Sequence, residues 1–193
     1  MQERLKISLD YSSGIIILGK RGAGKTTLAK FIIKSIPYQV VILDCMGRYR
    51  DLQKYQNRIA VYPVNPYQPQ TYEQILEKCY LHGNLWVVID EIDQYPFLKA
   101  GNLQKLVNVA RNWGIGYLVV SRDTAYIHKA WLRNSNYSFI FYHFEDLEVK
   151  RITRNYAVKE ADIKGLKPYE FLVFKDNSLI EKYKLDLPQD GKA

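Results

Sequence analysis

A short segment near the start of the chain has the residue types and spacing of a phosphate-binding loop, G-x-x-x-x-G-K-[ST]. Its members are Gly19, Lys20, Arg21, Gly22, Ala23, Gly24, Lys25 and Thr26, followed by Thr27. Glycines in such a loop let successive backbone N–H groups turn toward phosphate oxygens, and the next helix points its positive end at them. The pattern predicts that all of these residues border a nucleotide, that Lys25 contacts its terminal phosphates and that the Thr26 hydroxyl holds Mg²⁺. The segment therefore predicts binding of a nucleoside triphosphate, ATP.

Two adjacent carboxylates supply the second half of such a site. Asp90 and Glu91 follow the apolar run 86–89, which predicts a buried strand that ends at these residues. In this position Asp90 would hold the magnesium ion through water, and Glu91 would orient and deprotonate a water molecule that attacks the terminal phosphate. A kinase has less use for such a base, so the pair predicts hydrolysis with water as the acceptor.

The elements that must position these residues alternate along the chain. The run 15–18 predicts a strand before the loop, and apolar residues at Leu28, Phe31, Ile32 and Ile36 predict a helix over 27–36. Further strands are expected at 39–43, 59–64, 86–89, 117–121 and 138–142, and further helices at 71–81, 102–112, 125–133 and 146–155. A capping box at 71–74 is expected to open the helix 71–81. A hairpin of 170–174 with 179–183 is expected to close the chain.

This alternation predicts an α/β fold of the P-loop NTPase class, of the ASCE (additional strand, catalytic glutamate) type. The central sheet should be mostly parallel and flanked by helices on both faces, with a C-terminal β-hairpin. The chain has 193 residues, and we expect a single domain, residues 1–193.

Composition gives the expected partners and environment. There are 28 Lys and Arg against 20 Asp and Glu, a formal net charge of +8, which favours a polyanionic partner. The two cysteines, Cys45 and Cys79, have no metal-ligand spacing, so we expect reduced thiols without chemistry. No apolar run approaches the roughly 20 residues that cross a bilayer, and residues 1–6 lack the apolar core of a signal peptide. We therefore expect a soluble, intracellular protein without a transmembrane segment of its own.

One further segment carries a family resemblance. Together with the phosphate-binding loop and the acidic pair, the stretch from Val109 to Ser121, VARNWGIGYLVVS, resembles the HerA/FtsK superfamily of DNA-pumping ATPases. The small size and the region 137–183 are most similar to the genome-packaging ATPases of tailless icosahedral viruses. The resemblance implies that Arg111 acts as a finger on the nucleotide of a neighbouring subunit and that Ser121 senses the terminal phosphate. The family's glutamine at the strand end is replaced here by Arg122, which leaves two alternatives: Ser121 serves alone as the sensor, or Arg122 takes a cationic role of its own.

The resemblance also implies the assembly and the partners. It implies a ring, expected to be a hexamer, that threads double-stranded DNA and docks on a capsid or membrane protein at a portal vertex, in the host cytoplasm or the virion. The loop Ile92 to Asn102 follows the acidic pair and carries Tyr95, Phe97 and Lys99. We expect this loop to transmit hydrolysis to DNA, with Tyr95 and Phe97 as exposed aromatic side chains.

Two alternatives stay open at this point. A partition-type switch, an ATP-dependent dimer that binds DNA without pumping it, carries a signature lysine where this chain has Lys20. Against it, Arg21 replaces a glycine of that pattern and the position of Glu91 is not its arrangement. An assembly ATPase of filamentous phages has a similar core but is usually attached to a membrane segment.

Overall fold

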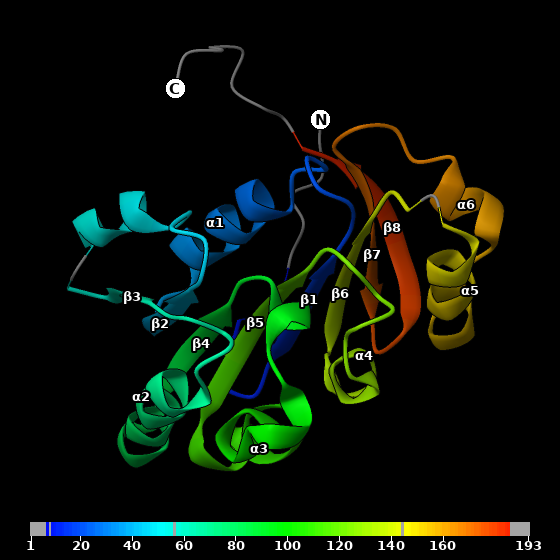
Figure 1. Ribbon diagram of the computed structural model, residues 1–193. Helices are drawn as coiled ribbons and strands as arrows, with labels where there is room; N and C mark the ends of the chain where they lie inside the picture. The colour runs from blue at the N-terminus through cyan, green and yellow to red at the C-terminus, as the bar shows by residue number, and fades with distance from the viewer. Residues whose placement is uncertain (1–6, 8, 56, 144, 186–193) are drawn as a thin grey trace.

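The computed structural model describes residues 7, 9–55, 57–143 and 145–185, which form one sheet of eight strands flanked by helices (Figure 1). The strands are β1 (Gly14–Leu18), β2 (Gln39–Asp44), β3 (Ile59–Pro63), β4 (Leu85–Ile89), β5 (Ile115–Ser121), β6 (Tyr137–Phe141), β7 (Glu170–Lys175) and β8 (Ser178–Lys184). No helix of the described residues is long and apolar enough to cross a membrane.

The strand order is β3-β2-β4-β5-β1-β6-β7-β8. Strands β1 to β6 pair in parallel, whereas β7 pairs antiparallel with β6 and with β8. Strand β5 lies between β1 and β4, so the ends of three parallel strands meet where the phosphate-binding loop and the acidic pair follow them. The predicted P-loop NTPase fold of the ASCE type is confirmed, including the closing hairpin.

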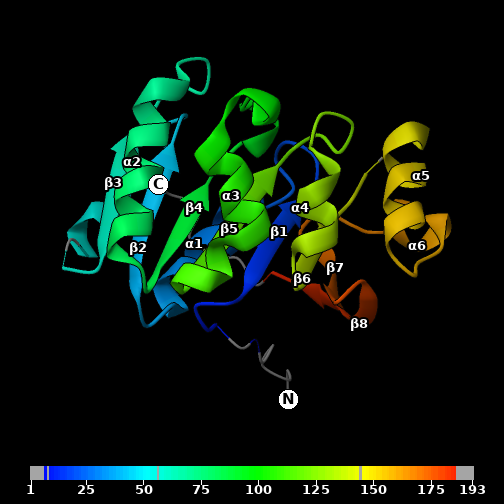
Figure 2. The ribbon, with the colours of Figure 1, turned by 90° about the horizontal axis from the view of Figure 1, so that it is seen from below.

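Helices cover both faces of the sheet, as predicted, but unequally (Figure 2). One face packs against α1 (Lys25–Ser35) and the 3₁₀ helix η1 (Arg50–Tyr55). The other packs against α2 (Pro69–His82), α3 (Gly101–Val109), α4 (Lys129–Asn134), α5 (Asp146–Asn155) and α6 (Glu160–Lys164). Strand β1 shows the expected alternation, because Ile15 and Ile17 belong to one core and Ile16 and Leu18 to the other.

The hairpin turn has a simple local cause. Asp176 and Asn177 join β7 to β8 with φ values of 47° and 65°, and two positive φ values define the type I′ turn that matches the twist of paired strands. Asp and Asn tolerate this left-handed region better than most residues. The turn therefore follows from the residue types of Asp176 and Asn177.

Three local predictions are wrong, and one short helix was not predicted. Helix α1 begins at Lys25, before the predicted Thr27, and its buried face is formed by Leu28, Ala29, Ile32 and Ile33, while Phe31 is 68% exposed. Tyr95 is 5% exposed and packs edge-on against Tyr72, so it is not an exposed aromatic. Helix α6 was not expected, because its five residues are too few for a periodic signal.

The predicted capping box of α2 is the third wrong local prediction. Thr71 lies inside the first turn, and its hydroxyl donates to the carbonyl of Gln68. The carboxylate of Glu73 instead accepts the backbone N–H groups of Asn102 (2.7 Å) and Leu103 (3.0 Å). Glu73 therefore caps α3, the neighbouring helix, rather than its own, because these N–H groups have no partner within α3.

Candidate nucleotide-binding site

The phosphate-binding loop connects β1 to α1 in a conformation that requires glycine at two positions. Gly19 has φ 155°, and a Cβ there would lie 2.5 Å from Cβ of Phe141. Gly24 has φ 104°, and a Cβ there would lie 2.8 Å from Cδ1 of Leu185 and 3.1 Å from Cδ1 of Tyr169. Neither the backbone angle nor the space admits another residue without a shift. The predicted loop thus has the tight curvature that directs backbone N–H groups inward.

Lys25 begins α1 and points back into the loop. Its side chain is buried, with 6% of the residue exposed, and its Nζ donates a hydrogen bond of 2.9 Å to the carbonyl oxygen of Lys20. Burial lowers the pKa of Lys25, while the charges of Glu91 and Asp90 oppose that shift. The ammonium group is therefore held among carboxylates at the floor of the loop.

The acidic pair lies opposite the loop at the end of β4. Asp90 is fully buried and Glu91 is 5% exposed. Glu91 has φ 51° and ψ 48°, the left-handed region that few side chains other than Asn, Asp and Gly adopt, and such outliers cluster at functional sites. Burial, and then the charge of Glu91, raises the pKa of Asp90 to about 6, and Arg48 opposes this rise. The charge of Asp90 is therefore favoured by the neighbouring guanidinium of Arg48.

Arg48 is the principal cation beside the pair, and the sequence analysis did not assign it to the site. Its Nη1 lies 2.9 Å from Oε1 of Glu91 and 3.7 Å from Oδ2 of Asp90. It follows β2, which pairs in parallel with β4, so the carboxyl ends of the two strands meet. The sequence offered one signal for Arg48, namely its place directly after a buried parallel strand. This signal did not distinguish Arg48 from the other positively charged residues of the polar segment after β2.

The end of β5 is connected to the turn after β4. The hydroxyl of Ser121 donates to Oδ1 of Asp93 (3.0 Å), and Nε of Arg122 lies 3.6 Å from Oε2 of Glu91 and 3.5 Å from Oδ2 of Asp93. Asp93 is a second residue that the sequence analysis missed. Ser121, the last residue of β5, therefore contacts the turn that follows β4. Arg122 lies within ion-pair distance of both this turn and Glu91.

These side chains surround one cavity of about 470 Å³. It is lined by Arg21, Gly22, Gly24, Lys25, Thr26, Thr27, Met46, Arg48, Glu91, Arg122 and Tyr169. The structure thus brings together the predicted loop and Glu91, and adds Arg48 and Arg122. Asp90 and Ser121 do not line the cavity, and both residues are fully buried.

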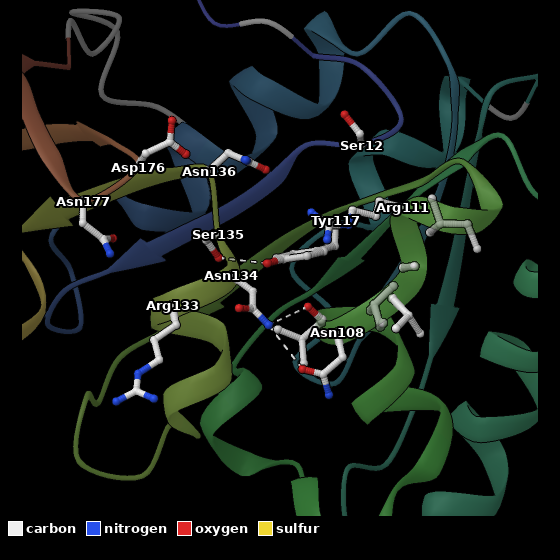
Figure 3. Close-up of a pocket in the computed structure, with 15 residues that line it drawn as sticks. Ser12, Asn108, Arg111, Tyr117, Arg133, Asn134, Ser135, Asn136, Asp176 and Asn177 are labelled. Carbon is white, nitrogen blue, oxygen red and sulfur yellow. Dashed lines mark hydrogen bonds between the residues drawn. The ribbon is translucent and has the colours of Figure 1, made fainter.

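Arg111 lies elsewhere. It is an exposed residue of the 3₁₀ helix η4 (Ala110–Trp113), directly before β5, at the edge of the sheet opposite the phosphate-binding loop. There it lines a polar pocket of about 360 Å³ together with Arg133. Figure 3 shows Arg111 and Tyr117 among the residues that line this pocket, and the hydroxyl of Tyr117 is hydrogen-bonded to Ser135 (3.2 Å). Arg111 therefore does not join the nucleotide site of its own chain.

Three features together define a P-loop ATPase. They are a glycine-rich loop between a parallel strand and a helix, an acidic pair at the end of a nearby strand, and a further strand inserted between these two strands. The sequence model of the AAA domain family matches residues 12–118, more than half of the chain. The chain belongs to this AAA domain family. No curated protein matches the sequence.

Solved structures show the same fold. B204, the DNA-packaging ATPase of Sulfolobus turreted icosahedral virus, is 18% identical with a TM-score of 0.77, over 90% of this chain and 97% of that one. B204 of Sulfolobus turreted icosahedral virus 2 in complex with ATP-γ-S is 18% identical with a TM-score of 0.78, over 92% and 99%. EssC of Geobacillus thermodenitrificans is 16% identical with a TM-score of 0.68, and the match spans 93% of this chain but 41% of that one. The resemblance to HerA/FtsK-like ATPases is confirmed at the level of the fold.

The residues present fit a magnesium ion bound with a nucleotide. Oδ2 of Asp90 is buried and has no hydrogen-bond partner among the described residues, and Thr26 borders the cavity. No group of three or more His, Cys, Asp or Glu side chains that could hold a metal is found in the described part of the chain. Mg²⁺ commonly uses one or two protein oxygens together with substrate phosphates, and Asp90 and Thr26 match that requirement.

Proposed function

We propose that the chain hydrolyses ATP within a ring of identical subunits and uses the reaction to move double-stranded DNA, as a packaging motor does. The observation that supports this proposal is the position of Arg111, to which the family resemblance assigns a catalytic role, at the edge of the sheet opposite the phosphate-binding loop. The loop and Glu91 lie at one edge, and Arg111 lies at the other. An arginine in that place can act on a nucleotide only from a neighbouring subunit.

Within one subunit each residue has a defined task. The backbone of Gly22 to Thr27 and the ammonium of Lys25 hold the phosphates. Thr26 and Asp90 would hold the magnesium ion, which neutralises charge on the phosphates. The carboxylate of Glu91 accepts a proton from the attacking water, so this base must be ionised when water attacks.

The arginines beside Glu91 connect the base to the phosphates. Arg48 and Arg122 border the same cavity as Lys25, and both lie within ion-pair distance of Glu91. A terminal phosphate competes with Glu91 for these guanidinium groups, because phosphate is the stronger bidentate partner. We expect ATP to draw the arginines toward its terminal phosphate and so to free the carboxylate of Glu91. Ser121 then reports the change through Asp93.

Two features support DNA as the partner. They are the net charge of the chain and the connection of Ser121, through Asp93, to a surface turn. The net charge of +8 favours a polyanion. Asp93, which binds Ser121, precedes the 3₁₀ turn η3 (Phe97–Lys99), in which Leu98 and Lys99 are exposed. We propose that Lys99 contacts the DNA backbone. We further propose that the ring is a hexamer, that residues 1–193 act as one domain, and that the ring works beside a capsid or membrane protein of a viral portal in the host cytoplasm or the virion.

The test is the ATPase rate with and without duplex DNA at low salt. We expect DNA of any sequence to raise the rate, with binding that weakens steeply as salt increases. Lys99→Ala should reduce this stimulation and leave the basal rate unchanged, whereas Lys78→Ala, an exposed lysine of α2, should change neither. Equal rates with and without DNA, from protein shown to be assembled, would contradict the motor. A nucleotide-dependent dimer under the same conditions would favour the partition-type switch.

A further inference from the structure

A second cavity lies on the other side of the phosphate-binding loop. It has a volume of about 500 Å³ and is bordered by Lys20 to Ala23, by the end of β6, and by the segment 164–170 before β7. Its walls include Phe141, Tyr142, Leu166, Pro168 and Tyr169. Three residues border both this cavity and the cavity that Glu91 lines, hereafter the catalytic cavity: Arg21, Gly22 and Tyr169. The two cavities are therefore separated by little more than the loop that binds the phosphates.

Tyr169 is held at this junction in an unusual conformation. Its φ is 65°, a region in which a bulky side chain is a genuine outlier. Its carbonyl oxygen accepts the N–H of Leu185 (2.9 Å), and its ring lies against Gly24 of the loop. Residues kept in such conformations by their surroundings cluster at ligand sites. This conformation places an aromatic ring beside the phosphate-binding loop.

Three charged side chains that border this second cavity, Lys20, Lys164 and Glu170, are engaged in ion pairs, and Arg21 and Lys167 border it as well. Nζ of Lys164 lies 2.6 Å from Asp146, Nζ of Lys20 lies 3.5 Å from Glu145, and Glu170 lies 2.7 Å from Nζ of Lys182. These ion pairs leave the aromatic and aliphatic walls as the main contact surface. The catalytic cavity differs, because Arg48, Glu91 and Arg122 project into it.

We propose that the second cavity receives the nucleobase of the bound nucleotide, which stacks on Tyr169. This inference rests on the proposed nucleotide hydrolysis. A flat, largely apolar base fits apolar walls better than a cavity filled by charged groups. Because Lys20, Lys164 and Glu170 are engaged in ion pairs and the other walls are largely aromatic and aliphatic, we expect the base to be recognised mainly by stacking rather than by hydrogen bonds to its edge. The substrate class is then purine nucleoside triphosphates, with ATP and GTP bound at similar strength and pyrimidine nucleotides bound more weakly.

The test compares ATP with inorganic tripolyphosphate, which has the phosphates but no base. Dissociation constants are measured for the wild type, Tyr169→Phe and Tyr169→Gly, with Tyr126→Gly, at a tyrosine that is 78% exposed, as a control. Glycine adopts a φ of 65° without strain, so Tyr169→Gly should fold. We expect this variant to bind ATP at least about tenfold more weakly, in line with the loss of one stacked ring, and tripolyphosphate as the wild type does. Tyr169→Phe should bind both normally.

Three results would overturn the inference. An equal loss of ATP and tripolyphosphate binding in Tyr169→Gly would show that Tyr169 only supports the loop. Unchanged ATP binding in that variant would place the base elsewhere. A preference of the wild type for ATP over GTP above about a hundredfold would require hydrogen-bond recognition of the base edge. If the wild type bound neither ATP nor tripolyphosphate, the proposed nucleotide hydrolysis itself would fail, a result distinct from these three.

Discussion

At the scale of single residues, Lys25 and Glu91 border the same cavity, and the proposed mechanism gives them separable tasks. Lys25 lies at the floor of the loop, and Glu91 lies across the cavity beside Arg48. Lys25→Ala removes the buried ammonium from the phosphates and should abolish ATP binding. Glu91→Gln keeps the shape but cannot accept a proton, so it should bind ATP nearly as the wild type does and lower kcat by at least about 100-fold. Calorimetry with ATP and a steady-state phosphate-release assay measure the two effects.

A Gln variant that hydrolyses ATP at the wild-type rate would remove the base role from Glu91. Glu77→Gln, at an exposed position of α2, is the matched control for the change from carboxylate to amide. Its binding and turnover should equal those of the wild type.

Arg48 gives a prediction about pH. Its charge lowers the pKa of Asp90, which burial and Glu91 raise to about 6. Without Arg48 the pKa of Asp90 rises further, because burial and the charge of Glu91 are then opposed mainly by the backbone N–H of Glu91. The acid limb of kcat/KM should therefore move to higher pH in Arg48→Ala, and Arg48→Lys should move it less. The measurement is the pH profile at saturating Mg²⁺.

Arg50→Ala, an exposed neighbour at the start of η1, should leave the pH profile unchanged. If Arg48→Ala lowered the rate equally at every pH, Arg48 would not govern the charge of Asp90.

The sequence predicted those site residues whose spacing along the chain is itself the signal. The loop from Gly19 to Thr26 is contiguous, and Glu91 follows a strongly apolar strand. The sequence did not reveal Arg48 and Asp93 as site residues. Their partners, Glu91 and Ser121, are 43 and 28 residues away along the chain and contact them only in the folded sheet. The pairing of parallel strands creates contacts between residues that are far apart in the sequence, and a local sequence pattern does not predict such contacts.

At the scale of elements, one carboxylate of α2 stabilises the start of α3. Glu73 accepts the N–H groups of Asn102 and Leu103, and its backbone carbonyl accepts from the side chain of Asn102. Glu73→Ala leaves two helix N–H groups without partners, and hydrogen bonds to charged groups contribute about 1.5–3 kcal/mol. We expect the free energy of unfolding to fall by about 2 kcal/mol, measured by urea denaturation. Glu77→Ala on the same helix should change it by less than about 0.5 kcal/mol, and an equal loss in both variants would contradict the cap.

Helix α5 carries a buried carboxylate in its first turn. Glu148 is 6% exposed, and burial, followed by the charges of Asp123 and Glu145, raises its pKa to about 7. Because the pKa in the unfolded chain is lower, the folded state binds this proton more tightly. The resulting destabilisation is absent below the unfolded pKa, grows as pH rises, and is complete above about 7.

Glu148→Gln should remove this pH-dependent penalty. We expect the variant to be more stable than the wild type at pH 8, by on the order of 1–3 kcal/mol, and the gain to be much smaller at pH 4. Urea denaturation at the two pH values measures the difference. A gain of equal size at both would assign the effect to packing rather than to charge.

The elements that the sequence predicted are those with long apolar runs or clear periodicity, such as β4 and the buried face of α3. The errors have physical causes. The pattern at 71–74 resembled a local cap, but Glu73 found its partners on another helix. Phe31 continued the apolar period of α1, yet the inward direction was taken by Ala29 and Ile33. Tertiary contacts decided both cases.

At the scale of the whole molecule, the sheet separates the two halves of the proposed catalytic site. Strand β5 has seven residues, so its ends are about 20 Å apart at roughly 3.3 Å per residue. Arg111 precedes the strand and Ser121 ends it. An arginine side chain cannot bridge this distance to the phosphates of its own chain. A catalytic role for Arg111 therefore requires a second copy that brings this edge to the nucleotide.

Mixing two inactive variants tests that requirement. Arg111→Ala should bind ATP but hydrolyse it poorly, and Lys25→Ala should not bind ATP. In a mixed ring, a subunit with Arg111→Ala still has an intact loop, and a neighbour with Lys25→Ala still has an intact Arg111. Mixtures should therefore recover activity that neither variant has alone, with a maximum near equal proportions. Arg133→Ala, which alters the other arginine of the same pocket, is the matched control and should not need such rescue. If assembled mixtures stayed inactive at every ratio, Arg111 would act on the fold of its own chain and the arginine from the neighbouring subunit would have to be sought elsewhere.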